Sequence, residues 1–282
     1  TLVYVLDKFL TQQLTAIDGV DVDPTASFAD LTTLRVGGKP QVTLRCSLPE
    51  AAVAALRYLE KEKIPFIVVG GGSNLLVSDG EVDVVAVVLD FAAVDMDTET
   101  GLVRAQAGAN WDDVVARSVQ LGLGGIECLS GIPGTVGAAP VQNIGAYGQE
   151  IVETLIEVEL IDEATGDVSV VPAAELGLGF RTSVLKNHYG SVAERSAVVL
   201  SVTLELREVG HGPFALSGAQ LRQALGVAED EGVTLEWVRQ TVLATRARKG
   251  MVLDDADPDT YSAGSFFQNA IVSASFARTL PP

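Results

Sequence analysis

The chain has 282 residues, and its hydrophobic fraction of 48% predicts a sizeable buried core divided over two or three domains or subdomains. Its 37 acidic and 19 basic residues give a net charge of −18, which argues against nucleic acid or an anionic membrane as the main partner. The two cysteines, Cys46 and Cys128, have no paired spacing, so neither a disulfide framework nor a metal site is predicted. Because there is no secretion signal and no apolar run of about 18 residues, we expect a cytoplasmic protein without membrane insertion.

The first predicted elements are a helix and a strand. Apolar residues recur at helical spacing within residues 49–63, which predicts a short amphipathic helix with Ser47 as its start signal. The apolar segment 64–69 follows and runs into a glycine turn, as a buried strand would.

The next stretch alternates strands with a helix. Residues 83–89 and 102–107 are apolar runs of strand length, and Asn110 is placed to cap a helix over residues 111–121. Together these segments indicate a βαβ-like unit with buried strands.

The second half of the chain begins with a predicted hairpin. Two apolar runs within residues 152–171 flank a turn at Gly166, so the architecture is α+β rather than doubly wound. Glycine and proline at 210–213 mark a boundary, and helices are predicted over residues 220–225 and 234–248.

Two glycine-rich runs, residues 70–76 and 130–148, carry the strongest functional signal. Small residues and free backbone amides let the chain approach a phosphate-bearing ligand closely. The first run lacks the lysine of a P-loop, since Gly72 is followed by Ser73 and Asn74, and neither run has the dinucleotide pattern between a strand and a helix. Two tight surface turns are the alternative, but the coincidence of both runs favours a large phosphate-bearing ligand.

Five motifs in matching order and spacing identify a resemblance. The chain resembles the UDP-N-acetylenolpyruvoylglucosamine reductase family of peptidoglycan precursor synthesis from about residue 30 to 275. The motifs occupy residues 33–38, 70–76, 124–147, 179–186 and 264–269.

The resemblance implies a fold and a cofactor. Family members are similar to flavoproteins of the vanillyl-alcohol-oxidase and p-cresol-methylhydroxylase type, with an α+β FAD-binding region in two subdomains and an α+β substrate-binding domain. Transferred to this chain, the three parts are residues 1–96, 97–210 and 211–282. FAD is expected to bind without a covalent link, because the two histidines, His188 and His211, lie outside both glycine runs.

The FAD-binding residues follow from the same motifs. Backbone amides would surround the FAD diphosphate and adenosine, with Ser73 and Asn74 adding side-chain donors, and neutral amides can do this in an acidic chain. The predicted cofactor-binding residues are Val69, Gly70, Gly71, Gly72, Ser73, Asn74, Leu75, Ser130, Gly131, Pro133, Gly134, Gly137, Ala138, Ala139 and Asn143.

The reaction implied by the resemblance has two half-reactions. NADPH reduces FAD, and the reduced flavin then reduces the enolpyruvyl group of UDP-N-acetylglucosamine enolpyruvate to give UDP-N-acetylmuramate. Arg181 matches the arginine that faces the substrate carboxylate, and Ser265 matches the proton donor. Arg246, Lys249 and Asn269 are predicted to bind the substrate, although helix-end charges explain the two cations equally well when taken alone.

Some positions depart from the family pattern. Ala270 stands where the family usually has proline, and Ser217 stands where a substrate-contacting tyrosine is expected. Family members also continue beyond the position of Pro282 and carry a second acid, a glutamate, to which no residue here is assigned. Two other functions remain open at this point: an FAD-dependent alcohol or sugar oxidase of the same fold, and a non-catalytic flavin-binding fragment.

Overall fold

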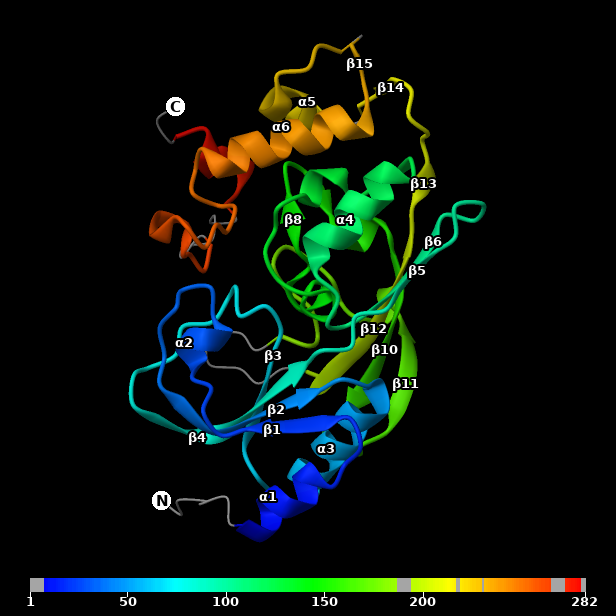
Figure 1. Ribbon diagram of the computed structural model, residues 1–282. Coiled ribbons are helices and arrows are strands. Elements are labelled where there is room, and N and C mark those ends of the chain that lie inside the picture. Colours follow the sequence, from blue (N-terminus) through cyan, green and yellow to red (C-terminus); the bar gives the residue numbers. More distant parts are fainter. Residues whose placement is uncertain (1–7, 187–193, 217–218, 230, 265–271, 280–282) are drawn as a thin grey trace.

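The computed structural model describes residues 8–186, 194–216, 219–229, 231–264 and 272–279. Figure 1 shows two neighbouring sheets: a four-stranded sheet with helices α1 (Lys8–Thr15) and α3 (Pro49–Lys61) in the lower part of the view, and a five-stranded sheet next to it. Helices α4, α5 and α6 lie above the sheets. The prediction of an α+β fold is confirmed by this arrangement.

The four-stranded sheet has the order β1-β2-β4-β3 and holds the first glycine run at one end. Strands β2 (Lys39–Cys46) and β3 (Phe66–Val69) both pair in parallel with β4 (Glu81–Leu89), and β1 (Val20–Asp23) pairs antiparallel with β2. Helix α3 is the crossover between β2 and β3, and its buried face packs on the sheet. The short α2 (Phe28–Leu31) lies between β1 and β2 in the sequence.

One detail of the first predicted helix was wrong. The helix forms as expected, but its N-cap is Leu48, with Pro49 at the first helical position. The Ser47 hydroxyl donates instead to the carbonyl of Gly19 at 3.1 Å. Proline at the first turn fixes the start of the helix without needing a capping side chain.

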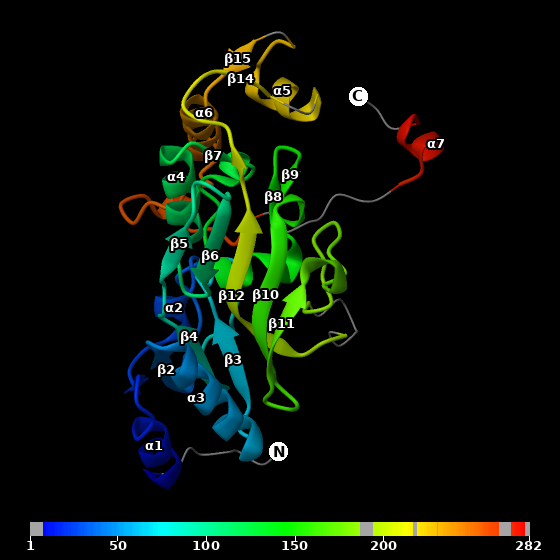
Figure 2. The ribbon, with the colours of Figure 1, turned by 90° about the vertical axis from the view of Figure 1, so that its right-hand side faces the viewer.

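The five-stranded sheet is entirely antiparallel, with the order β11-β10-β12-β6-β5. Figure 2 shows β12, β10 and β11 side by side. The predicted hairpin is confirmed, with Gly166 in the left-handed region at φ +71°. The strands are β5 (Val94–Met96), β6 (Leu102–Gln106), β10 (Leu155–Asp162), β11 (Val168–Pro172) and β12 (Ala197–Glu205).

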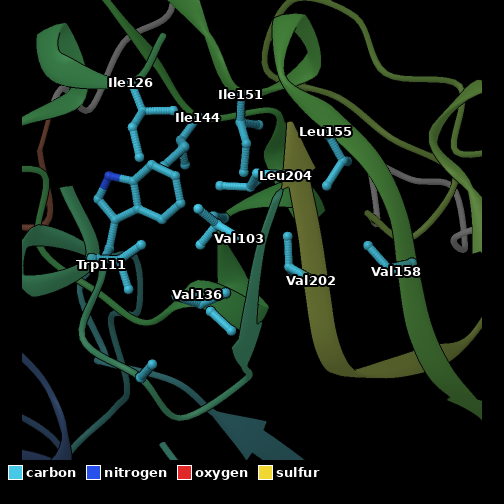
Figure 3. Packing of buried hydrophobic residues seen from close by; sticks show 14 of the residues in the cluster. Val103, Trp111, Ile126, Val136, Ile144, Ile151, Leu155, Val158, Val202 and Leu204 are labelled. Atoms are coloured by element: carbon cyan, nitrogen blue, oxygen red, sulfur yellow. The ribbon is translucent and has the colours of Figure 1, made fainter. Parts of the chain in front are cut away.

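Helix α4 (Trp111–Gln120) closes one end of this sheet and anchors the main core. The Asn110 side chain accepts a hydrogen bond from the Asp113 amide at 3.1 Å, which confirms the predicted cap. Figure 3 shows the Trp111 ring among Val103, Ile126 and Ile144. The indole nitrogen donates to the Leu129 carbonyl at 3.2 Å, so this buried side chain has no unsatisfied polar atom.

The remaining elements form a smaller region that follows the boundary at 210–213. Helices α5 (Ala219–Leu225) and α6 (Leu235–Ala247) pack around a third core, and Gly250 at φ +63° follows the end of α6. The other short elements are β7 (Leu123–Gly124), β8 (Gly145–Ala146), β9 (Gln149–Glu150), β13 (Arg207–Glu208), β14 (Phe214–Ala215), β15 (Gly232–Val233) and α7 (Ala274–Ala277). The domain boundaries at 96/97 and 210/211 stay predictions. No helix in the described ranges is long and apolar enough to cross a membrane.

Candidate functional site

A cleft of about 770 Å³ lies where the two sheets and the α6 region meet. Both glycine runs line it: all of a first glycine loop, residues 70–75, and most of a second glycine loop, residues 131–139. The lining is completed by Val68, Trp111 and residues of the segments 141–145, 180–186 and 246–264. The structure therefore brings into one cavity segments from all three of the predicted parts of the chain.

The first glycine loop presents unpaired backbone donors to this cleft. None of the amides of residues 70–75 donates a hydrogen bond to any described part of the chain. Gly72 has φ +61°, and a Cβ there would lie 1.9 Å from the Leu31 carbonyl oxygen, so only glycine fits. Unpaired amides in a rigid turn are a favourable site for a phosphate group.

The second glycine loop divides into a fixed part and a free part. The amides of Val136 and Gly137 donate to the carbonyls of Ala109 and Ala107, both at 2.9 Å, which attaches the loop to the chain before α4. The amides of Gly134 and Thr135 donate to no described residue, and both residues line the cleft. The hydrogen bonds of Val136 and Gly137 therefore hold the free amides of Gly134 and Thr135 in place without a ligand.

The two glycine loops contact each other directly. A Cβ on Gly71 would lie 2.6 Å from the Gly134 Cα, a distance that real side chains do not tolerate. The Ser73 hydroxyl donates to the Pro133 carbonyl at 3.0 Å. The Ser73 side chain, predicted as a donor to the cofactor, thus links the two loops in this structure.

Five of the predicted cofactor-binding residues do not line the cleft: Val69, Ser130, Gly131, Gly137 and Asn143. All are buried, and they support the loops. The Ser130 hydroxyl donates to the Glu127 carbonyl at 2.6 Å, and the Asn143 side chain donates to Glu150 at 2.8 Å and to the Gly179 carbonyl at 3.0 Å. A Cβ on Gly137 would meet the Ala107 side chain at 2.6 Å.

Arg181 lines the cleft in a strained conformation. Its φ is +55°, in the left-handed region that arginine rarely adopts. One guanidinium nitrogen donates to the Gly145 carbonyl at 2.8 Å, and no described carboxylate forms an ion pair with it. Most of its five donors therefore remain available to a ligand.

Two further cations line the same cleft. Lys186 donates through Nζ to the Arg181 carbonyl at 3.1 Å, and it was not among the predicted site residues although its motif was recognised. Arg246 is only 8% exposed and donates to the carbonyls of Gly131 and Met251 at 3.2 and 3.1 Å. Burial lowers the pKa of the Arg246 guanidinium. We call Arg181, Lys186 and Arg246 the cation cluster.

The other predicted substrate and catalytic residues lie elsewhere. Lys249 is exposed after the end of α6 and is not part of the cleft lining. Ser265 and Asn269 lie outside the described residues. The segment that leads to Ser265 does line the cleft, from Thr260 to Gly264 with a gap at Tyr261.

This segment is attached to the loop after α2. The Thr33 hydroxyl donates to the Ser262 carbonyl at 2.8 Å. Arg35 forms an ion pair with Asp255, and its guanidinium lies 5.4 Å from the centre of the Tyr261 ring. The motif at 33–38 therefore holds the chain that precedes Ser265 against the first sheet.

Helices α4 and α6 are joined beside the cleft. The Asp112 carboxylate accepts two hydrogen bonds from Arg239, at 2.6 and 2.8 Å, and one from the Gly131 amide at 2.6 Å. Burial favours the protonated carboxyl, but the hydrogen bonds from Arg239 and Gly131 outweigh it, so the pKa of Asp112 lies below its usual value. One carboxylate thereby fixes α6 and the start of the second glycine loop together.

Neither cysteine has the environment of a nucleophile. Both thiols are fully buried, and burial raises the pKa of Cys46 to about 12 and that of Cys128 further. The thiolate is the reactive form, so both side chains are inert at neutral pH. Cys128 is a core residue, as expected from the sequence.

The residues of the cleft fit a dinucleotide cofactor. Unpaired amides on two touching loops suit a diphosphate, and apolar side chains such as Leu75 and Ile132 line the same space. The positions closest to the loop contact have no room for a side chain.

Comparisons with known proteins agree with this description. A family model described as an FAD binding domain matches residues 40–171. The solved structure of UDP-N-acetylenolpyruvylglucosamine reductase (MurB) from Thermus caldophilus superposes with a TM-score of 0.59 at 28% identity, covering 89% of this chain and 75% of that one. Berberine bridge enzyme superposes with a TM-score of 0.56 at 15% identity, over 73% of this chain and 44% of that one, which shows the fold alone.

Fold and site together define an FAD-binding flavoprotein. UDP-N-acetylenolpyruvoylglucosamine reductase of Corynebacterium glutamicum (strain R) is 48% identical over 274 residues, which are 96% of this chain and 73% of that protein. The reductase of Mycobacterium avium is 46% identical, over 92% of this chain and 70% of that protein. The chain belongs to the UDP-N-acetylenolpyruvoylglucosamine reductase family.

Proposed function

We propose that the chain reduces UDP-N-acetylglucosamine enolpyruvate to UDP-N-acetylmuramate with NADPH as the reductant, a step of peptidoglycan precursor synthesis. The observation that carries this function is the cleft itself, where an amide cradle for a dinucleotide borders a cation cluster without paired carboxylates. Both the cofactor and the substrate carry a diphosphate, and the substrate adds a carboxylate.

FAD is held in this proposal by the two glycine loops. The unpaired amides of residues 70–75, together with those of Gly134 and Thr135, bind the diphosphate, and each hydrogen bond to a charged acceptor is worth about 1.5 to 3 kcal/mol. When bound there, FAD would supply the redox chemistry as a two-electron carrier between NADPH and the enolpyruvyl group. The five buried residues that support the loops keep these donors in place before the cofactor binds.

Arg181 binds the carboxylate of the substrate. Reduction of the enolpyruvyl group places negative charge on the carbon next to the carboxylate and on its oxygens. A guanidinium with free donors, held by the Gly145 carbonyl, stabilises that charge without moving. Arg246 adds a second positive charge to the same wall of the cleft.

Ser265 then supplies the proton to this carbon. It follows Gly264, which lines the cleft at φ +77°, so the chain approaches the site from the segment anchored by Thr33. A hydroxyl can protonate a strongly basic enolate when it is held in line with it. Lys249 and Asn269 remain the proposed contacts to the substrate diphosphate.

We place this reaction in the cytoplasm, without nucleic acid as a partner. Two buried free thiols suit a reducing compartment, and a net charge of −18 repels polyanions.

The proposal is tested by product analysis of the purified flavoprotein. Incubation with NADPH and UDP-N-acetylglucosamine enolpyruvate is expected to oxidise one NADPH per substrate and to give a product heavier by two hydrogen atoms. Ser265→Ala is expected to keep its flavin and to slow product formation by about 10² to 10⁴. NADPH oxidation that needs oxygen and ignores the substrate would instead support an oxidase.

A further inference from the structure

Lys186 contacts the backbone of Arg181 at the point where that backbone is strained. The left-handed backbone is strained for a residue with a side chain, and Arg181 has φ +55°. The Lys186 Nζ donates to the carbonyl of this same residue at 3.1 Å. Two hydrogen bonds of 3.2 Å between Gly179 and Thr182 close the turn around it.

Through Gln142, Lys186 also connects this turn to Asn74 of the first glycine loop. Its Nζ lies 3.4 Å from the side-chain oxygen of Gln142, which in turn lies 3.4 Å from the Asn74 amide nitrogen. All four side chains line the cleft. A single ammonium therefore links Arg181 to the walls that hold the cofactor.

Stability alone does not account for a lysine at this position. Burial, and then the charge of Arg181, lower the pKa of Lys186, which means that the charged form is disfavoured there. No described carboxylate pairs with it, although the chain has 37 acidic residues. Two neighbouring cations without an acid between them favour binding of an anion at the expense of stability.

We propose that Lys186 is a positioning residue that acts through Arg181. Its ammonium holds the Arg181 carbonyl and thereby fixes the left-handed backbone from which the guanidinium reaches the substrate carboxylate. This inference rests on the proposed function, in which Arg181 binds that carboxylate.

A double-mutant cycle tests the inference. Arg181→Met, Lys186→Met and the double variant are compared by the rate at which substrate reoxidises photoreduced flavin. The substrate Kd of the same proteins is also measured without turnover, from the absorbance change of the oxidised flavin on titration with substrate. Lys186→Met is expected to slow reoxidation by about 10- to 100-fold, since small displacements of a reacting group have effects of this size. The double variant is expected to be slower than Arg181→Met by no more than about twofold, because residues that act through one another are not additive.

Two further variants separate positioning from folding. Lys186→Arg keeps the charge and the donors and is expected to regain most of the rate, whereas Lys61→Met removes an exposed lysine at the end of α3 and is expected to change nothing. The unfolding midpoint of Lys186→Met should not fall, since an apolar side chain relieves the repulsion by Arg181.

Each contradicting outcome is distinct. The role of Lys186 alone would be overturned if the reoxidation rate of the double variant fell by the product of the two single-variant factors. It would also be overturned if Lys186→Met were reoxidised as fast as the wild type. A wild-type protein that neither binds the substrate nor is reoxidised by it would overturn the proposed function and this role with it.

Discussion

The first glycine loop and the cation cluster line the same cleft but are built in opposite ways. The loop offers neutral backbone amides in a turn that only glycine can form, directly after strand β3. The cluster offers three charged side chains whose hydrogen bonds within the described residues go to carbonyl or amide oxygens. One region binds an anion by geometry and the other by charge.

This difference explains how a chain with a net charge of −18 accommodates two anionic ligands. In the proposed function, amide donors bind the cofactor diphosphate without placing cations beside the flavin. Under the same proposal, positive charge is concentrated where the substrate carboxylate is to be stabilised. Changes in the loop should therefore affect FAD content, and changes in the cluster should affect the substrate half-reaction.

Within these two regions, the largest expected effect is that of Arg181→Met on the substrate half-reaction. Removal of one preorganised donor to a developing negative charge slows a reaction by about 10² to 10³. The rate of reoxidation of photoreduced flavin by substrate should fall by this factor, while the FAD content stays that of the wild type. Arg104→Met, which removes an exposed arginine of β6, is the control. A loss of FAD in Arg181→Met would show that the cation cluster also contributes to cofactor binding.

Gly71→Ala should affect the cofactor instead. The added methyl group would lie 2.6 Å from the Gly134 Cα and force the two glycine loops apart. Overpacking of about 1 to 3 kcal/mol corresponds to FAD binding weaker by roughly 5- to 150-fold, measured by titration of the apoprotein. Gly212→Ala, where an added Cβ meets nothing within 4 Å, should bind FAD normally. Equal affinity in both variants would contradict the contact between the loops.

Asp112→Asn tests the link between the second glycine loop and helix α6, which carries Arg246. Loss of the charged hydrogen bonds to Arg239 should lower the free energy of unfolding by about 1 to 3 kcal/mol at pH 7. Because the folded pKa of Asp112 is lowered, its stabilisation is complete above the pKa of an unfolded aspartate, about 4, and is lost as the pH falls below it.

Denaturant unfolding of both proteins between pH 7 and pH 3 measures this effect. The difference between the wild type and Asp112→Asn is expected to shrink as the pH drops below 4. A difference that stays constant over this range would mean that Asp112 does not act as an ionised, hydrogen-bonded carboxylate in the folded protein.

The smallest expected effect is that of Ser73→Ala. It removes the hydrogen bond of 3.0 Å to the Pro133 carbonyl, worth about 0.5 to 1.5 kcal/mol. FAD affinity should fall by roughly 2- to 10-fold, with little change in the reoxidation rate. An effect as large as that of Gly71→Ala would indicate that the Ser73 hydroxyl also contacts the cofactor.

Most helices and several strands of the fold were predictable, but two inner strands were not. Helices α3, α4 and α6 carry periodic apolar residues and clear end signals, so they lie within a few residues of their predicted bounds. Strands β2 and β12 were not predicted, although each is central in its sheet. Their place depends on pairing with strands distant in sequence, which local patterns do not encode.

The candidate site shows the same limit. Gly70, Gly71 and Gly72 were predicted as a ligand loop because a glycine run after a strand has few other uses. That Gly137 packs on Ala107, or that Asn143 holds Gly179, follows only from contacts between distant segments. Lys186 was missed for this reason, since its partner is a backbone carbonyl rather than a side chain with a sequence signal.

The central claim is that one cleft separates cofactor binding from substrate binding, and anaerobic stopped-flow absorbance tests it most directly. NADPH is mixed with the yellow protein, and UDP-N-acetylglucosamine enolpyruvate is added once the flavin band has bleached. Bleaching followed by recovery of the band is the predicted result. Bleaching without recovery would contradict the assignment of the cation cluster to the substrate, and no bleaching at all would contradict the proposed reaction.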